Sequence, residues 1–170
     1  TPLYSSAASD VYKRQKRQIR PMSRFDIVII GGGPGGLSCA AALAREGAKV
    51  VLLERKQNIG SKTCAGGITW HGLIRQVPAS LIQRTFPEQH IFTNRQRISF
   101  KKPDPIIATV NREDLGKWML KEAAAAGAEI RTGCLVKNIS GRTLTATSGT
   151  GSAFSLQFEH VVGADGSTSM

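Results

Sequence analysis

Three glycines, Gly31, Gly33 and Gly36, form the pattern G-x-G-x-x-G directly after an apolar run at 25–30. In this spacing the first glycine permits a tight turn, the second lets a phosphate approach the backbone, and the third lets a helix pack closely on a strand. Glu54 stands 23 residues after Gly31, at the end of a second apolar run. Its carboxylate can accept hydrogen bonds from both hydroxyls of a ribose and would repel a 2′-phosphate. These residues predict a site for an adenosine diphosphate group; a glycine-rich turn without a ligand is the alternative.

Further positions carry groups that could contact such a ligand. Arg112 stands at the expected start of a helix, where a guanidinium offers paired donors to phosphate oxygens; a solvated arginine is the alternative. Asp165 and Gly166 follow a short apolar run, and an ordinary Asp-Gly turn is the alternative there. Cys64 lies ten residues after Glu54 in a loop of small residues and could instead be a structural free cysteine.

Other kinds of chemistry lack support. The three histidines, His71, His90 and His160, do not have the spacing of metal ligands, and the chain has no C-x-x-C motif or paired carboxylates. It also has no G-x-S-x-G motif. The sequence therefore predicts neither a metal site nor hydrolase chemistry.

The periodicity of the chain indicates the elements that position these residues. Strand, helix and strand are expected at 25–30, 37–46 and 49–54, which make a compact βαβ unit. A clear helix is expected at 111–126 with Asn111 as its N-cap, and a weak one at 70–84, interrupted by Pro78. Further strands are expected at 91–100, 106–110, 128–131, 134–140, 143–147, 154–158 and 160–163. The fold class predicted is α/β: a three-layer, Rossmann-like domain with a parallel sheet and a β-meander.

Composition sets the limits of the interpretation. The chain has 170 residues, 41% of them hydrophobic, and no apolar run approaches the ~20 residues that cross a bilayer. The net charge is +11, of which +5 falls in residues 1–24, expected to be a disordered and non-native basic leader. The small and odd number of cysteines, three, counts against a disulfide scaffold and indicates a reducing compartment. The folded domain is expected at 25–170, as the N-terminal part of a longer protein.

Four motifs resemble one superfamily. G-G-G-P-G-G at 31–36 is similar to the G-x-G-P-x-G turn of the glutathione-reductase-type FAD fold, and G-A-D-G at 163–166 to a strand end of flavin hydroxylases and their relatives. The run from Arg112 to Leu115 resembles the R-x-x-L segment of the same superfamily. C-A-G-G at 64–67 resembles a loop of the geranylgeranyl reductase family, where it passes beside the flavin ring.

This resemblance implies FAD as the cofactor and assigns residues to it. The cofactor-binding residues that it implies are Gly31, Gly33, Pro34, Gly35, Gly36, Glu54, Arg55, Cys64, Ala65, Gly67, Arg112, Val136, Asp165 and Gly166. Cys64 is also the candidate catalytic residue. Val136 rests on its spacing from Arg112 alone, and a plain core valine is the alternative.

The expected function is that of an FAD-dependent oxidoreductase. By its resemblance to the geranylgeranyl reductases, it is expected to saturate isoprenoid double bonds. NAD(P)H or another reductant would supply electrons, the substrate would be an isoprenoid or lipid, and the location cytoplasmic, with peripheral contact at the membrane. A chain that stops before the substrate domain is expected to be inactive alone. The alternatives are an FAD-dependent monooxygenase and a basic nucleic-acid-binding module; the lack of aromatic residues in the basic run counts against the latter.

Overall fold

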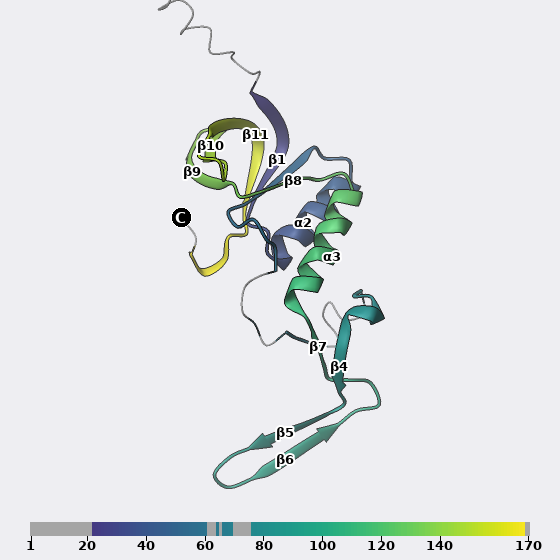
Figure 1. Cartoon of the computed structure of the whole chain (residues 1–170). Coiled ribbons are helices and arrows are strands. Elements are labelled where there is room, and N and C mark those ends of the chain that lie inside the picture. Colours follow the sequence, from purple (N-terminus) through teal and green to yellow (C-terminus); the bar gives the residue numbers. More distant parts are fainter. Residues whose placement is uncertain (1–21, 61–63, 65, 70–75, 169–170) are drawn as a thin grey trace, which may run out of the picture.

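A six-stranded sheet forms the centre of the protein, as shown in the computed structural model, which describes residues 22–60, 64, 66–69 and 76–168 (Figure 1). The strand order is β8-β2-β1-β11-β10-β9. Neighbours among β8, β2, β1 and β11 are parallel, whereas β11, β10 and β9 are antiparallel. The bounds of these strands are β1 Ser23–Ile30, β2 Val50–Glu54, β8 Glu129–Thr132, β9 Leu135–Ser140, β10 Thr143–Thr147 and β11 Ala153–Gly163. The predicted parallel sheet and β-meander are confirmed.

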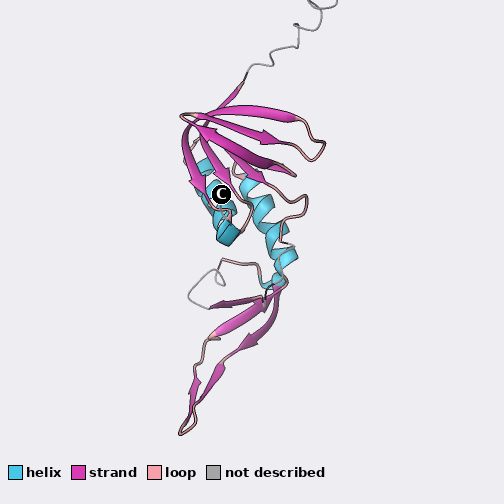
Figure 2. Ribbon diagram, turned by 90° about the vertical axis from the view of Figure 1, so that its left-hand side faces the viewer, coloured by secondary structure: helices cyan, strands magenta, loops and turns pink. Residues whose placement is uncertain are grey.

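Two helices, α2 Pro34–Arg45 and α3 Arg112–Ala125, lie on the same side of this sheet (Figure 2). Successive residues of β1 and β2 point to opposite faces. Ile29 and Leu52 pack in the core beneath the helices, while Val28 and Val51 pack in a second core with residues of the meander. Because both faces of these strands are covered, the runs are apolar throughout, as expected of a buried parallel sheet.

The middle of the chain extends away from the main sheet (Figures 1 and 2). A small antiparallel sheet has the order β3-β7-β4, and a separate hairpin pairs β5 with β6. One face of the hairpin carries Ile91, Ile98 and Phe100, all exposed, while Phe92 on the other face lies beneath the guanidinium of Arg97. The bounds are β3 Gly67–Thr69, the 3₁₀ turn η2 Ala79–Leu81, β4 Ile82–Phe86, β5 Glu88–Phe92, β6 Arg97–Lys101 and β7 Ile107–Val110.

Two sequence predictions for this middle region were wrong. The end of the expected helix at 70–84 is instead η2 and the start of β4; residues 70–75 lie outside the described part. Pro78 precedes η2 and cannot donate a helical hydrogen bond. The single strand expected at 91–100 is a hairpin, because Gln96 N donates to Thr93 Oγ1 at 3.0 Å and closes a turn.

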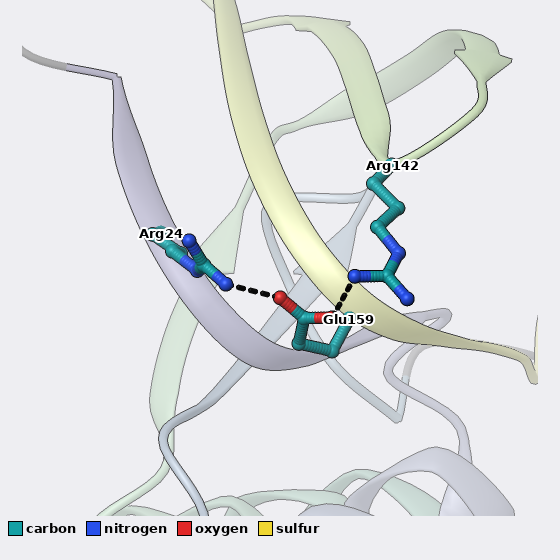
Figure 3. Close-up of polar contacts among 3 residues, drawn as sticks. All are labelled: Arg24, Arg142 and Glu159. Carbon is teal, nitrogen blue, oxygen red and sulfur yellow. Dashed lines mark hydrogen bonds and ion pairs between the residues drawn. The ribbon is translucent and has the colours of Figure 1, made fainter.

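The strands expected at 154–158 and 160–163 are one continuous strand, β11. The polar residue Glu159 does not interrupt it, because the residues on both sides of Glu159 pair with β1. The Glu159 carboxylate forms ion pairs with both Arg24 and Arg142 (Figure 3). Arg24 and Ser23, which the sequence placed in the leader, belong to β1 and pair with β11. The boundary expected at residue 24 is therefore wrong by two residues.

The helices were compared with the length and hydropathy that a membrane-spanning helix requires. No helix within the described ranges is both long and apolar enough to cross a bilayer.

The predicted cap of α3 is confirmed. Asn111 Oδ1 accepts hydrogen bonds from the amides of Glu113 and Asp114, at 2.8 and 3.2 Å. We expect Asn111→Ala to lower the free energy of unfolding by about 1 kcal/mol, because two amides of the first turn lose their acceptor. Urea denaturation followed by circular dichroism measures this, with Asn138→Ala on the exposed face of β9 as the control. Equal stability of the two variants would contradict the role of the cap.

Candidate functional site

The glycine turn lies where β1, α2 and the end of β11 meet. The amide of Gly31 donates to Leu53 O, and that of Ala164 donates to Ile30 O, each at 2.8 Å. Gly31 has a φ of +112°, and a Cβ atom on it would lie 2.3 Å from Ala164 O. A Cβ atom on Gly36 would lie 2.0 Å from Gly31 O. Neither position can hold a side chain, so the two predicted packing roles are confirmed by the geometry.

The other glycines of the motif face open space. A Cβ atom on Gly33 or on Gly35 would meet no atom within 4 Å. They stand at the N-terminus of α2, where free amides and the helix dipole favour an anion. A cavity of about 550 Å³ begins here. It is lined by Gly31, Gly32, Gly33, Pro34, Gly35, Leu37, Glu54, Arg55, Lys56, Asn58, Ile59, Gly60, Arg112, Gly116, Ala164, Asp165, Gly166 and Ser167.

Glu54 ends β2 and holds the glycine turn from the neighbouring strand. Its Oε2 accepts from Gly32 N at 2.6 Å, and its Oε1 accepts from Lys56 N at 2.8 Å. Each carboxylate oxygen has a second lone pair, so both can still accept from a ligand in the cavity. The sequence predicted the ligand contact but not these two backbone contacts.

Arg112 is the first residue of α3 and is half-buried at the cavity. Its Nε atom is buried and has no hydrogen-bond partner within the described part of the chain. A buried donor without an acceptor is costly, and a phosphate oxygen would supply one. The arrangement fits the predicted contact between Arg112 and a diphosphate.

A second cavity, of about 60 Å³, also borders Glu54. Val136, Cys134 and Leu135 form one wall of it, and it shares Gly31, Glu54, Arg55 and Asp165 with the larger cavity. Val136 is thus brought to the site, although its side chain is also buried in the core beneath the meander. The alternative of a core valine is therefore confirmed, and the contact of Val136 with a ligand stays a prediction.

The loop with Cys64 is the part of the predicted site that the geometry does not join to the rest. Cys64 is exposed, and its Sγ accepts from Gly66 N at 3.5 Å. Gly67 belongs to β3 and pairs with Thr109. Neither residue lines either cavity, and Ala65 lies outside the described residues. Their contact with a flavin stays a prediction.

Several lining residues were missed from the sequence, among them Lys56, Gly60 and Gly116. Gly116 could have been noticed in the sequence. A glycine inside a helix lowers helix stability by about 1 kcal/mol relative to alanine, so its presence there indicates a close packing contact. No group of three or more potential metal ligands occurs among the described residues.

Comparison with known proteins gives the family. The sequence pattern of the Thi4 family matches residues 8–111, which contain the glycine turn and Glu54. The chain belongs to the Thi4 family. It is also 31% identical over 164 residues to a protein encoded in the 5′ region of nifH2 in Methanosarcina barkeri, covering 88% of this chain and 87% of that protein.

For relatives with named activities, the matched region covers a larger share of this chain than of the relative. Geranylgeranyl diphosphate reductase of Rhodobacter capsulatus is 32% identical over 153 residues, 86% of this chain and 38% of the reductase. Thiamine thiazole synthase of Methanococcus vannielii is 33% identical over 116 residues, 67% of this chain and 41% of the synthase. The chain thus spans about two fifths of either enzyme.

The structures agree with this grouping. A geranylgeranyl bacteriochlorophyll reductase-like protein of Thermoplasma acidophilum superposes with a TM-score of 0.75 at 22% identity, over 85% of this chain and 40% of that one. A myxobacterial FAD-dependent halogenase superposes with a TM-score of 0.73 at 21% identity, over 86% and 38%. The predicted resemblance to the geranylgeranyl reductases is confirmed, and the fold is one that FAD-dependent enzymes of several activities share.

The adjacent glycines 35 and 36 form a matched pair for testing the turn. Gly36→Ala places a Cβ atom against the backbone of Gly31, so we expect it to lower the free energy of unfolding by roughly 1–3 kcal/mol. Gly35→Ala meets open space and should leave the free energy of unfolding unchanged or raise it by up to about 1 kcal/mol. Urea denaturation of the ligand-free protein measures both. Equal losses in the two variants would contradict the close contact.

Cys134 provides a chemical test of the smaller cavity. Burial raises the pKa of its thiol, and nearby Arg131 only partly opposes this. A raised pKa leaves less thiolate at a given pH, and the thiolate is the reactive form. We expect Cys134 to be alkylated by iodoacetamide at pH 8 at least about tenfold more slowly than the exposed Cys64, and its rate to keep rising above pH 8.5. Mass spectrometry of the labelled peptides measures both rates; similar rates at the two cysteines would show that the cavity is open.

Proposed function

We propose that the protein binds FAD in the larger cavity, with the diphosphate at the N-terminus of α2. The observation that carries this proposal is the combination of side-chain-free glycines and a buried donor at one cavity. Gly33 and Gly35 leave room for phosphate oxygens to reach the backbone, and Arg112, whose buried Nε has no hydrogen-bond partner among the described residues, lines the same cavity. The residues therefore fit the cofactor that FAD-dependent proteins of the same fold contain.

Glu54 would receive the adenosine end of this cofactor. Its two oxygens are held in place by Gly32 N and Lys56 N and line the cavity, so they can accept from ribose hydroxyls without moving. The carboxylate would also repel a 2′-phosphate, which disfavours the adenosine of NADP at this position. The smaller cavity beside Val136 would take part of the adenine ring.

The proposed activity is that of a reductase of isoprenoid double bonds. When bound and reduced, FAD supplies a hydride to one alkene carbon while a proton reaches the other, and NAD(P)H or another reductant restores the reduced flavin. The 32% identity with a geranylgeranyl diphosphate reductase over 86% of this chain supports this activity. This chain's own residues bind and orient the cofactor, and Cys64 would adjust the flavin or the proton supply at the ring.

Because isoprenoid substrates are lipids, the same proposal includes peripheral contact of the protein with a membrane surface. The protein would otherwise be cytoplasmic and would not bind nucleic acid. The hairpin β5–β6 supports such contact, since Ile91, Ile98 and Phe100 lie exposed on one face of it. Large exposed apolar residues gathered in one place indicate an interaction surface.

An FAD-dependent monooxygenase is the second candidate. It is favoured by the structural similarity to p-nitrophenol 4-monooxygenase of Pseudomonas putida, which has a TM-score of 0.72. The two activities differ in their need for oxygen. A reductase consumes reducing equivalents without it, whereas a monooxygenase requires it.

The cofactor site is tested by three variants of the FAD-loaded protein. Glu54→Gln and Arg112→Ala each remove a charged partner, so we expect FAD affinity to fall by roughly tenfold to a hundredfold. Cys39→Ala, on the helix α2 but outside both cavities, is the control and should retain FAD. Equilibrium dialysis with flavin absorbance measures the affinities. Equal retention in all three variants would mean that the site is misplaced.

The activity is tested with the full-length protein and a geranylgeranyl lipid without oxygen, using dithionite as the donor. We expect a saturated product from the wild type, and slower turnover or a shifted flavin spectrum from Cys64→Ala with FAD still bound. Mass spectrometry of the lipid measures the gain of two hydrogens. An enzyme that is inert without oxygen and hydroxylates an aromatic compound with it would replace the reductase proposal by the monooxygenase.

A further inference from the structure

Two backbone segments touch directly behind Arg112. Gly60 lies in the loop that follows β2, and Gly116 lies one turn inside α3. A Cβ atom on Gly116 would lie 2.9 Å from Gly60 Cα. A Cβ atom on Gly60 would lie 2.6 Å from Arg112 O and 2.8 Å from Glu113 Cα. The loop therefore rests on the first turn of α3 with no side chain between them.

Neither glycine is explained by the phosphate-binding turn, which is formed by a different part of the chain. Gly60 has a φ of +85°, which few other residues adopt. Gly116 weakens the helix in which it stands by about 1 kcal/mol relative to alanine. Both line the larger cavity together with Arg112. The contact between them fixes how closely α3 approaches the loop at the wall of the cofactor site.

This contact has a direct consequence for Arg112. Its carbonyl oxygen is the atom that Gly60 approaches, its buried Nε has no hydrogen-bond partner in the described part of the chain, and the residue lines the larger cavity. A side chain at either glycine would push the first turn of α3 away from the loop and carry the guanidinium with it. A bidentate contact with phosphate tolerates little displacement.

We propose that Gly60 and Gly116 are positioning residues that hold Arg112 at the distance from which it binds the diphosphate of the dinucleotide. The proposal rests on the dinucleotide site proposed above and adds the part of the chain that sets its phosphate end. We expect the adenosine end to be independent of this contact, because Glu54 is held by Gly32 N and Lys56 N, and because Gly60, Arg112 and Gly116 are absent from the lining of the smaller cavity. A displaced α3 should therefore weaken binding of phosphate groups and spare binding of adenosine.

The test compares ADP with adenosine by isothermal titration calorimetry on the full-length protein with its flavin removed. We expect Gly116→Ala to weaken ADP binding about tenfold, the low end for a lost charged hydrogen bond, and adenosine binding less than about twofold. Lys121→Ala, an exposed position on the same helix, is the matched control and should change neither.

A double-mutant cycle separates positioning from general destabilisation. If Gly116 acts through Arg112, the Arg112→Ala, Gly116→Ala double variant binds ADP no more weakly than Arg112→Ala alone. Loss of adenosine and ADP in equal proportion, or additive losses in the double variant, would overturn the proposal. Should Gly116→Ala fail to fold, Gly60→Asn serves from the other side of the contact, since asparagine tolerates a positive φ. Failure of both to fold would also overturn it, because the contact would then be needed by the fold as a whole.

Binding by the wild-type protein separates failure of the positioning role from failure of the dinucleotide site. A wild-type protein that binds neither ADP nor FAD would contradict the dinucleotide site itself. A wild type that binds ADP, with Gly116→Ala equal to it, would leave the site in place and contradict only the positioning role.

Discussion

The close contact of backbone with backbone at Gly31 is the constraint on which the rest of the site depends. Gly31 lies against Ala164 at the end of β11 and against Gly36 in the first turns of α2, with no room for a Cβ atom at either glycine. This contact fixes the end of β1, the start of α2 and the end of β11 relative to one another. Open space at Gly33 and Gly35 is its consequence, since α2 then begins at the edge of the larger cavity rather than over it.

A carboxylate and a guanidinium complete the site from two other elements. Glu54 bridges the glycine turn and the loop after β2 through hydrogen bonds to Gly32 N and Lys56 N. Arg112 comes from α3, whose first turn is capped by Asn111 and rests on Gly60. The ends of three parallel strands and the starts of two helices thus meet at one edge of the sheet, as ligand sites of α/β folds commonly do.

The part of this arrangement that could be predicted from the sequence is the part fixed by local chemistry. The G-x-G-x-x-G spacing, the apolar strands around it and the cap of α3 each leave a signal in neighbouring residues. The contact between Gly60 and Gly116 leaves almost none, because it joins segments 56 residues apart in the chain. The other errors have their own causes. The turn between β5 and β6 contains neither glycine nor proline and is closed by backbone and side-chain hydrogen bonds between Thr93 and Gln96, so it leaves little signal in the sequence. Strand β11 continues through Glu159 because the residues on both sides of it pair with β1, which is distant in the chain. The helix predicted at 70–84 is wrong over its end, where Pro78 precedes η2 and β4.

Binding at the adenosine diphosphate end is tested by comparing FAD with FMN, which lacks the adenosine monophosphate portion. Titration of the flavin-free protein, followed by flavin fluorescence, gives the two dissociation constants. Because the site is built around Glu54 and Arg112 at the adenosine diphosphate end, we expect FAD to bind at least about a hundredfold more tightly than FMN. Equal affinity for the two flavins would contradict this expectation, since the cavity would then recognise the flavin ring without these two residues.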